Sequence, residues 1–552
     1  MAKKTTKPAP AEDTNTGLVT EDNDFAQLLD EHLRAGYQAL YVHTAEEARA
    51  EVEITRVARR LNMGVVTWDC YEGFSCDALS GNNKYKNAVS ALEALNDEAL
   101  FNGNQVFIFR DLDDFMVDTN VRRRIRTLTE GNRLVNKKHK RPIIILSPKL
   151  SIHDKVKANI SVVEFLLPGE AKLARTVEFV RQSIESKDPE KAQCTDELRA
   201  QLVTNLLGLT ANEAENCLAR CLVRHSGFSP EMLSTIKDEK AAIVKKSEVL
   251  TYIPEGAIAS REEIGGFDQY LTWLERRKQA YLPSARAMNI DYPRGVVLLG
   301  LPGTGKSMVG KATCQLLGLP GYILDIGSLF GSLVGESEQR THDVLKQIDA
   351  QKGCVLLIDE ADKALGHAHT SQGDSGVTKR VFGTILTWLA ENQSKTFCIM
   401  TLNRTEGLPP ELTRAGRFDA MWYTDLPNSV ECQQIMEIHF KKRGVDMLSM
   451  GLDTDDWTMI TEKLHGFVGS EIEEAVREAR YIAFEKRHTG DPTFEEIIEA
   501  AASIVPISQR DSEGVEAIRK FCKDKARPVT TPLTISSGKQ HGRAQRSVEI
   551  DN

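Results

Sequence analysis

The sequence predicts an α/β protein built from two successive blocks, and two observations support this fold class. In each block, short apolar segments alternate with amphipathic segments of helical length, and each block ends in a stretch that is helical in character. Strands that alternate with helices favour a parallel sheet covered by helices on both faces. With 552 residues, the chain has room for about two to four domains of roughly 150 residues each.

Composition and charge exclude several classes of protein. The chain is 41% hydrophobic and 27% charged, so it is neither fibrous nor disordered throughout. Its net charge of −9 argues against a chain built as a whole to coat nucleic acid or an anionic membrane. No apolar run approaches the roughly 18 residues that a membrane helix needs, and the cysteines lack metal-site spacing. We expect reduced thiols, no membrane partner and a cytoplasmic location, or the plastid stroma or a bacteriophage-infected cytoplasm if the source is such.

The first block follows a polar arm, residues 1–20, which we expect to be disordered. Its predicted strands assign an α/β domain to residues 21–168, and residues 169–253 are predicted to be helical. Thr210 and Glu213 have the spacing of a capping box, which marks one helix start. The predicted strands cover residues 40–43, 65–68, 105–109, 142–146 and 162–167.

The second block repeats this alternation after a polar hinge near Pro254. It predicts an α/β domain at 254–425, a helical domain at 426–510, and a C-terminal helix with a disordered tail at 511–552. From Lys525 onward, the tail consists largely of Ser, Thr, Pro, Gly and charged residues. The predicted strands cover residues 295–299, 322–325, 354–358, 397–401 and 421–424.

A glycine-rich loop directly follows the strand at 295–299 and precedes a predicted helix at 307–317. The run GLPGTGKS matches G-x-x-x-x-G-K-[ST], in which backbone N–H groups wrap phosphates at a helix N-terminus. We expect Lys306 to reach the β- and γ-phosphates of ATP and Ser307 to bind Mg²⁺. A chance glycine-rich turn would not be expected to have this strand and this helix around it. The nucleotide-binding candidates are Gly300, Pro302, Gly303, Thr304, Gly305, Lys306 and Ser307.

Two carboxylates end the apolar strand at 354–358. Ligands of open α/β sheets bind at the carboxyl ends of the strands, so we expect Asp359 to hold Mg²⁺ through water. Glu360 is expected to orient or deprotonate the attacking water. Residues 359–362 also spell the DEAD sequence of RNA helicases, but only a helical piece follows where a helicase needs a second ATPase-like domain.

Three further residues complete the predicted catalytic set. Asn403 ends the strand at 397–401, where its amide can contact the γ-phosphate or the water. Arg414 and Arg417 lie on a glycine-containing loop and suit arginine fingers that stabilise charge on the transferring phosphoryl group. Arginines placed this way act on a neighbouring subunit's nucleotide, which predicts a ring.

The order of these motifs resembles the AAA clade of AAA+ ATPases over about residues 260–505. Besides the motifs above, the resemblance includes the run Ile264-Gly265-Gly266-Phe267 and the run Val334-Gly335-Glu336-Ser337-Glu338. It implies a P-loop NTPase (AAA+) module whose helical domain, 426–510, is a lid. It also implies ATP and Mg²⁺ as cofactors and a homo-oligomeric ring, most often hexameric.

The resemblance assigns further roles. Asn403 matches sensor 1, Arg414 and Arg417 match paired arginine fingers, and His439 matches a lid histidine near the ribose and base. Gly469 and Ser470 match the lid turn near adenine, where the clade usually has Gly-Ala. The first pore loop matches Leu333, Val334 and Gly335, and an aliphatic Leu333 stands where protein-threading members usually have an aromatic.

The first block resembles, more narrowly, the N-terminal half of the AAA proteins named after a hypothetical chloroplast open reading frame (ycf type), found in cyanobacteria, plastids and other bacteria. That family is only loosely linked to photosynthesis and carbon use. The residues that carry this resemblance are Tyr41-Val42-His43-Thr44-Ala45-Glu46-Glu47, Ile145-Leu146-Ser147-Pro148, Gly208-Leu209-Thr210 and Val505-Pro506-Ile507-Ser508.

The first block keeps the strand pattern of an ATPase domain but lacks its chemistry. Its first strand is followed by Thr44-Ala45-Glu46-Glu47, with no glycine or lysine, and these carboxylates would repel phosphate. We interpret the block as a degenerate ATPase-like domain with its own helical lid, which recruits a protein partner through residues 21–250. A basic cluster between Arg122 and Arg141 is either a solvated helix face or a site for nucleic acid or an acidic partner.

Three classes of function remain open. The favoured one is an ATP-driven remodeller of a protein partner. The alternatives are a nucleic-acid-associated motor or loader, motivated by the basic cluster, and an ATP-dependent scaffold or switch, motivated by Leu333 and the inert first block. Nucleic acid is not favoured because of the net charge of −9.

Overall fold

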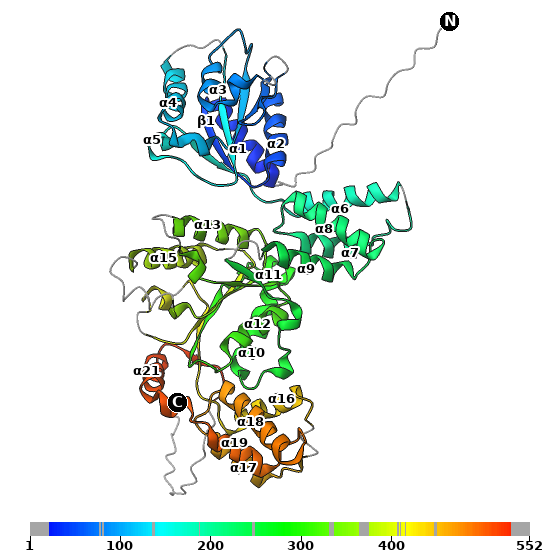
Figure 1. Ribbon diagram of the computed structural model, residues 1–552, viewed down its shortest axis with the longest axis vertical. Helices are drawn as coiled ribbons and strands as arrows, with labels where there is room; N and C mark the ends of the chain where they lie inside the picture. The colour runs from blue at the N-terminus through cyan, green and yellow to red at the C-terminus, as the bar shows by residue number, and fades with distance from the viewer. Residues whose placement is uncertain are drawn as a thin grey trace, which may run out of the picture. The chain divides into compact units, whose positions relative to one another are not determined.

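The computed structural model divides into two compact units, residues 1–240 and 241–552 (Figure 1). It describes residues 21–531 except for 77–78, 80–81, 135–138, 187, 245–248, 331–335, 364–374, 393, 406–407, 409, 415 and 446–449. The predicted arm at 1–20 and the tail from 532 onward lie outside the described residues. No helix of the described part has the length and apolar character needed to cross a bilayer.

The first unit has a six-stranded sheet in the order β3-β2-β4-β5-β1-β6. All neighbouring strands are parallel except β3, which is antiparallel to β2. The strands are β1 (Ala39–His43), β2 (Gly64–Asp69), β3 (Gly73–Phe74), β4 (Gln105–Arg110), β5 (Ile143–Ser147) and β6 (Ser161–Glu164).

Alternate strand residues of the first unit supply two apolar layers, because successive side chains point to opposite faces of a sheet. Leu40 and Ile144 pack with α1 (Glu21–Ala35) and α2 (Glu47–Arg60) on one face. Tyr41 packs on the other face with the second group of helices (Figure 1). That group consists of α3 (Ala88–Ala94), α4 (Thr119–Leu134) and α5 (Asp154–Lys157).

A helical region completes the first unit. Its helices are α6 (Glu170–Glu185), α7 (Asp196–Leu206), α8 (Ala211–His225) and α9 (Met232–Val244). The predicted capping box is present: Thr210 Oγ1 accepts from the Glu213 N–H, and the Glu213 carboxylate accepts from the Thr210 N–H.

The second unit has a seven-stranded sheet in the order β13-β12-β8-β11-β10-β9-β7. Only β7 is antiparallel to its neighbour, β9. The strands are β7 (Leu250–Tyr252), β8 (Gly295–Gly300), β9 (Gly321–Leu324), β10 (Val355–Ile358), β11 (Phe397–Leu402), β12 (Ala420–Thr424) and β13 (Arg527–Pro528).

Helices cover both faces of this second sheet, and a separate helical group forms the lid. One face packs against α10 (Asp268–Lys278) and α12 (Lys306–Leu317). The other packs against α13 (Glu336–Asp349), α15 (Ser375–Glu391) and α21 (Ser512–Cys522). The lid consists of α16 (Ser429–Lys442), α17 (Thr454–Lys463), α18 (Gly469–Arg487) and α19 (Phe494–Ser503), and the short helices are α11 (Pro283–Ala287) and α20 (Ile507–Arg510).

The two sheets share one strand order. Numbered within each unit, the five main strands run 5-1-4-3-2: β6-β1-β5-β4-β2 in the first unit and β12-β8-β11-β10-β9 in the second. The predicted α/β fold class is therefore confirmed. Each main strand of the first unit has a counterpart in the second unit, so residues at the ends of corresponding strands can be compared.

Three strands were not predicted. Residues 250–252 were assigned to the helical stretch but form β7, which pairs with β9. The tail was expected to be disordered from Lys525, but β13 pairs with β12 at the sheet edge. The short β3 pairs with β2. Each of these strands is two or three residues long, so its order depends on a neighbouring strand and not on a local sequence pattern.

Candidate active site

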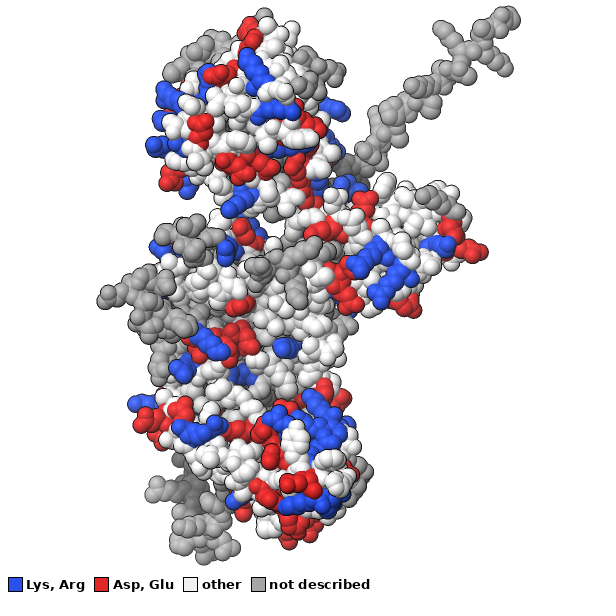
Figure 2. All heavy atoms as spheres, viewed as in Figure 1, with Lys and Arg blue, Asp and Glu red and all other residues white. Residues whose placement is uncertain are grey.

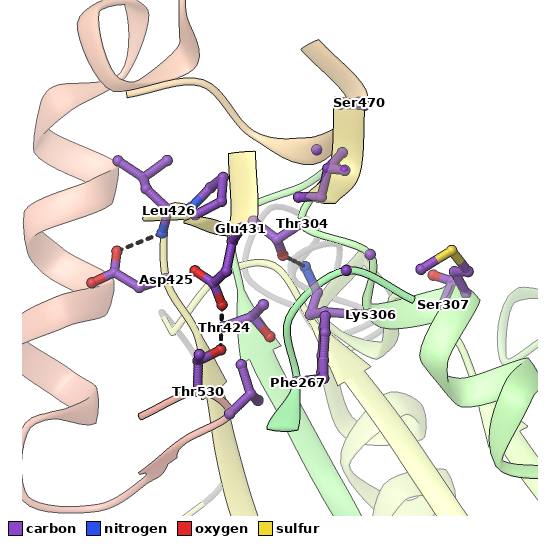
Figure 3. Close-up of a pocket in the computed structure, with 18 of the residues that line it drawn as sticks. Phe267, Thr304, Lys306, Ser307, Thr424, Asp425, Leu426, Glu431, Ser470 and Thr530 are labelled. Atoms are coloured by element: carbon purple, nitrogen blue, oxygen red, sulfur yellow. Dashed lines mark hydrogen bonds between the residues drawn. The ribbon is translucent and has the colours of Figure 1, made fainter. Parts of the chain in front are cut away.

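The second unit contains a cavity of about 550 Å³ between its sheet and its lid (Figure 3). Its walls come from the phosphate loop, the residues before α10, the connection from β12 to α16, the start of α18, and residues 528–531. Most nucleotide-site candidates line it: Pro302, Gly303, Thr304, Gly305, Lys306, Ser307, Glu360, Asn403, His439, Gly469 and Ser470. The structure thus brings together residues that are far apart in sequence.

The phosphate loop connects β8 to α12 through two left-handed glycines. Gly303 has φ +82° and Gly305 has φ +88°, a conformation that favours glycine. A Cβ on Gly303 would also lie 2.1 Å from Ser470 Oγ. The Ser470 N–H donates to the Gly303 carbonyl at 3.0 Å, so the lid turn rests directly on the loop. At the strand end, a Cβ on Gly300 would lie 2.4 Å from the Thr424 carbonyl oxygen.

Lys306 is buried inside this loop, with 5% of its surface exposed. Its Nζ donates to the Gly300 carbonyl at 2.8 Å and to the Leu301 carbonyl at 2.6 Å. Burial lowers the pKa of Lys306 to about 8, against an opposing effect of the nearby carboxylates of Asp362, Asp359 and Glu360. The ammonium group is held by neutral carbonyls, which leaves its positive charge available to an anion in the cavity.

Asp359 lies directly against the phosphate loop. Its Oδ1 accepts from Ser307 Oγ at 2.7 Å and from Thr401 Oγ1 at 2.5 Å. A hydroxyl and a carboxylate at this separation suit a hard cation, because Mg²⁺ takes oxygen ligands and usually retains several waters. The two residues predicted to hold the metal are therefore adjacent and fit it.

Glu360 follows Asp359 at a left-handed position, with φ +49°. Its N–H donates to Thr401 Oγ1 at 2.8 Å, which fixes the turn. The carboxylate pairs with Lys363 and accepts from Asn403 Nδ2 at 3.5 Å. Glu360 and Asn403 both line the cavity, so a general base candidate and an amide occur side by side at the ends of adjacent strands.

His439 lines the cavity from α16 of the lid. Its Nδ1 lies 3.7 Å from Glu473 Oε1, and the same carboxylate oxygen binds Arg443 at 2.8 Å. Burial lowers the pKa of His439, while the hydrogen bond from Arg443 lowers the pKa of Glu473. Burial therefore favours the neutral imidazole, which can both donate and accept a hydrogen bond.

The two finger candidates do not line this cavity. Arg414 is exposed, and Arg417 Nη1 donates to the Glu411 carbonyl at 2.9 Å. The predicted pore-loop residues Leu333, Val334 and Gly335 lie outside the described residues.

Several residues of the cavity were not among the predicted site residues. Phe267 was part of the motif run but had no assigned role, and it adopts φ +66° beside the phosphate loop. Glu431 lines the cavity from the first turn of α16, and residues 528–531 line it from the segment predicted to be disordered. No local motif marks that segment, since its contribution depends on pairing with β12.

The matching position in the first unit has no phosphate cradle. The loop between β1 and α2 has only residues 44–46, whereas residues 301–305 separate β8 from α12. Glu47 is the first residue of α2, as Lys306 is of α12. It pairs with Arg110 Nε at 2.5 Å, and Arg110 also binds Glu51 at 2.8 Å.

The contact between the helical region and the loop after β1 in the first unit also differs from the contact between the lid and the phosphate loop in the second unit. The Ala211 N–H at the start of α8 donates to Glu46 Oε1 at 2.6 Å, and Glu46 is buried. In the second unit the lid turn instead donates to the Gly303 carbonyl. A buried carboxylate therefore stands where the second unit presents its phosphate loop to the lid.

Most of the described arginines of the basic cluster bond to groups of their own unit. Arg122 donates to the Met116 and Val117 carbonyls at 2.6 Å, and Arg141 donates to the Leu95 carbonyl at 2.7 Å. On the face shown in Figure 2, Lys and Arg are interspersed with Asp and Glu. The side chains of residues 131–138 lie outside the described set. The described arginines thus favour the structural interpretation of the cluster.

The 5-1-4-3-2 sheet, the phosphate loop, the acidic strand end and the helical lid define the second unit as an AAA+ ATPase module. Residues 296–426 match the family model described as "ATPase family associated with various cellular activities (AAA)". Residues 25–165 match "SpoVK-like AAA ATPase, N-terminal domain", and 175–247 match "SpoVK-like AAA ATPase, second domain".

Similar proteins extend this assignment to the whole chain. The chain is 31% identical to the ycf46 AAA domain-containing protein of Pyropia yezoensis over 509 residues, 91% of this chain and 98% of that protein. It is 29% identical to the ycf46 protein of Guillardia theta over 490 residues, 89% and 93% of the two chains. The chain belongs to the family of ycf46 AAA domain-containing proteins. It is also 28% identical to the cell division cycle protein 48 homolog of Archaeoglobus fulgidus over 312 residues, 56% of this chain and 41% of that one.

Proposed function

We propose that this protein binds ATP with Mg²⁺ in the cavity around Lys306 and hydrolyses it with Glu360 as the catalytic carboxylate. The observation that carries the proposal is the position of Glu360 and Asn403 on the same cavity as the phosphate loop. A buried ammonium, a hydroxyl–carboxylate pair and a catalytic carboxylate together meet the needs of phosphoryl transfer.

Each group has a separate part in this mechanism. Lys306 and the loop N–H groups bind the phosphates, and Ser307 with Asp359 would hold Mg²⁺. When bound, Mg²⁺ would supply positive charge that neutralises the charge of the phosphates. Glu360 accepts a proton from the attacking water, and Asn403 orients that water or the γ-phosphate. His439 and Ser470 close the lid side of the site.

The test separates binding from turnover. We expect Lys306→Ala to abolish nucleotide binding, and Glu360→Gln to retain binding but lose turnover by about 100-fold or more, since it removes the base and not the cradle. Lys311→Ala, on the same helix but away from the cavity, is the matched control. Normal turnover by Glu360→Gln would show that Glu360 does not have the assigned role.

A homo-oligomeric ring, most simply a hexamer, is part of the proposal. Arg414 and Arg417 do not line their own chain's cavity, which supports action on a neighbour's nucleotide. A phosphoryl-transfer site completed by a second subunit would explain two arginines on one exposed loop. A cytoplasmic or plastid stromal location is proposed with it.

For the biological role, we propose remodelling of a protein partner recruited by the first unit. The ion pair of Glu47 and Arg110 stands where an ATPase would bind phosphate, which supports a binding role for this unit and not a second ATPase activity. Arginines engaged with main-chain carbonyls speak against a nucleic-acid motor, while the aliphatic Leu333 keeps a scaffold or switch as the second candidate. The Glu360→Gln form, isolated with its trapped partner, should retain a protein and not nucleic acid. ATP turnover that rises several-fold with DNA or RNA would favour the motor.

A further inference from the structure

A short segment at the C-terminal end of the described chain lies along the edge of the second sheet. We call residues 527–531 the strap. Trp422 and Tyr423 of β12 pair with Arg527 and Pro528 in parallel register. The Val529 N–H donates to the Tyr423 carbonyl at 3.0 Å, and Val529 is 4% exposed. The strap is thus a docked element of the fold.

The strap reaches the phosphate loop through α10. The Val529 carbonyl accepts from the N–H groups of Gln269 and Tyr270, at 2.9 and 3.3 Å. These N–H groups lie in the first turn of α10, where a helix has no partners of its own, and the residue before the helix, Phe267, supplies no side-chain cap.

The hydrogen bonds from Gln269 and Tyr270 to the Val529 carbonyl fix the start of α10 and, with it, the preceding residue, Phe267. Phe267 has φ +66°, a conformation that is strained for a non-glycine residue and persists only when its surroundings fix it. Its ring lies 3.6 Å from where a Cβ on Gly305 would be. The strap therefore supports a strained residue that packs against the phosphate loop.

The strap also reaches the lid. Thr530 Oγ1 donates to Glu431 Oε1 at 2.6 Å (Figure 3). The other carboxylate oxygen of Glu431 accepts from the Asn428 N–H at 2.8 Å and so caps α16, the first lid helix. In Figure 3 this contact lies across the cavity from Ser307.

We propose that the strap is a wall of the nucleotide site that ties the lid to the sheet, so that bound nucleotide and the docked strap stabilise each other. Strap residues 528–531 line the cavity, and the same residues bond β12, α10 and α16. Because coupling between two binding events is reciprocal, loss of the strap weakens nucleotide binding and nucleotide slows release of the strap. The inference rests on the proposed ATP binding at this cavity.

The first test removes one hydrogen bond and preserves side-chain shape. Thr530→Val should raise the Kd for ATP roughly three- to tenfold, because it deletes a hydrogen bond to a charged group. Thr458→Val is the matched control, since it makes the same change on α17 of the lid and away from the cavity. It should leave the Kd unchanged. An equal Kd for Thr530→Val and the wild type would count against the role of the lid contact.

The second test compares two truncations of the full chain. Deleting residues 527–552 removes the strap, whereas deleting 532–552 retains it. The first should raise the Kd for ATP by about tenfold or more and the second by less than about twofold. If both truncations bind ATP as the full chain does, the proposal is overturned.

The reciprocal test measures the strap itself. In the Glu360→Gln protein, hydrogen exchange at the Val529 amide should slow by about fivefold or more when ATP is added. Unchanged exchange, with ATP bound, overturns the coupling. If the wild-type protein binds no ATP at all, the proposed function fails first, whereas intact binding without any strap dependence rejects the strap alone.

Discussion

Glu47 and Arg110 form an ion pair in the first unit at the positions that Lys306 and Asp359 occupy in the second, with the charges reversed. Glu47 and Lys306 each begin the helix after the first main strand, and Arg110 and Asp359 each come at the end of the third. The carboxylate and the guanidinium meet at 2.5 Å, so each neutralises the charge of the other. The first unit therefore has an internal ion pair at the positions where the second unit has its phosphate-binding and metal-binding side chains.

This pair predicts that the first unit is stabilised by Arg110 and takes no nucleotide. Arg110→Ala leaves the carboxylates of Glu47, Glu51 and Asp69 together, and we expect it to lower the free energy of unfolding of that unit by about 1–2 kcal/mol, given its partial exposure. Calorimetric titration should still give one ATP per chain with unchanged affinity. Arg126→Ala, which removes only an exposed pair with Glu130 at 3.5 Å, should cost less than about 0.5 kcal/mol. A stoichiometry of two would refute the inert site.

The buried ammonium of Lys306 makes ATP binding depend on pH. Its pKa is about 8, below the usual 10.5, because of burial, and bound phosphates would raise it by favouring the charged form. Below pH 8 the group is charged in both states, so affinity should not change through Lys306. Above pH 8 binding takes up a proton, and the Kd should rise by up to about tenfold per pH unit. Titrations at several pH values, in buffers of different ionisation enthalpy, would measure this uptake; a Kd that is constant from pH 8 to 9.5 would contradict it.

The finger assignment predicts complementation between two inactive proteins. Arg417→Ala should retain ATP binding but lose turnover by about 1,000-fold, the scale typical of an arginine finger. Lys306→Ala has intact fingers and no phosphate cradle. Mixing the two should restore part of the ATPase rate, because some sites then combine a good cradle with a good finger. If no mixture exceeds the sum of its parts, fingers acting between subunits are excluded.

The contact between Gly303 and the lid turn predicts how a substitution of Gly303, alone and together with one of Ser470, changes the affinity for ATP. Gly303→Ala places a methyl group 2.1 Å from Ser470 Oγ and forces φ +82° on a residue with a side chain. We expect ATP affinity to fall about tenfold or more. Adding Ser470→Gly removes the overlap but not the backbone strain, so affinity should recover only in part. Full loss of binding in Ser470→Gly alone would mean that Ser470 contributes directly to binding.

The long strands and the central site could be predicted because their signals are local. Buried parallel strands such as β5 and β8 are continuous apolar runs, and the run from Gly300 to Ser307 contains its chemistry in adjacent residues. These patterns can be recognised in the sequence without knowledge of what packs against them.

The remaining features depend on pairing over long distances in sequence. The strap has the composition of a loop and is ordered because it donates a hydrogen bond to β12 and accepts two from α10. Arg122 and Arg141 were candidates for a binding surface, but each donates to carbonyl groups that no sequence pattern marks. The Glu47–Arg110 pair is equally invisible in the sequence, because it joins residues on different elements.

The left-handed corner at the end of the third main strand occurs in both units. Asp111 has φ +53° and Glu360 has φ +49°, yet only Glu360 faces a cavity with a phosphate loop. The unusual backbone is therefore a property of the strand-to-helix corner and not of catalysis. If the two units descend from one ancestral ATPase domain, the first unit has kept the backbone conformation of this corner after losing the ATPase residues around it. An enzyme that loses its reaction can keep the geometry of its active site as architecture, so a strained residue at such a corner is not by itself a sign of a working catalyst.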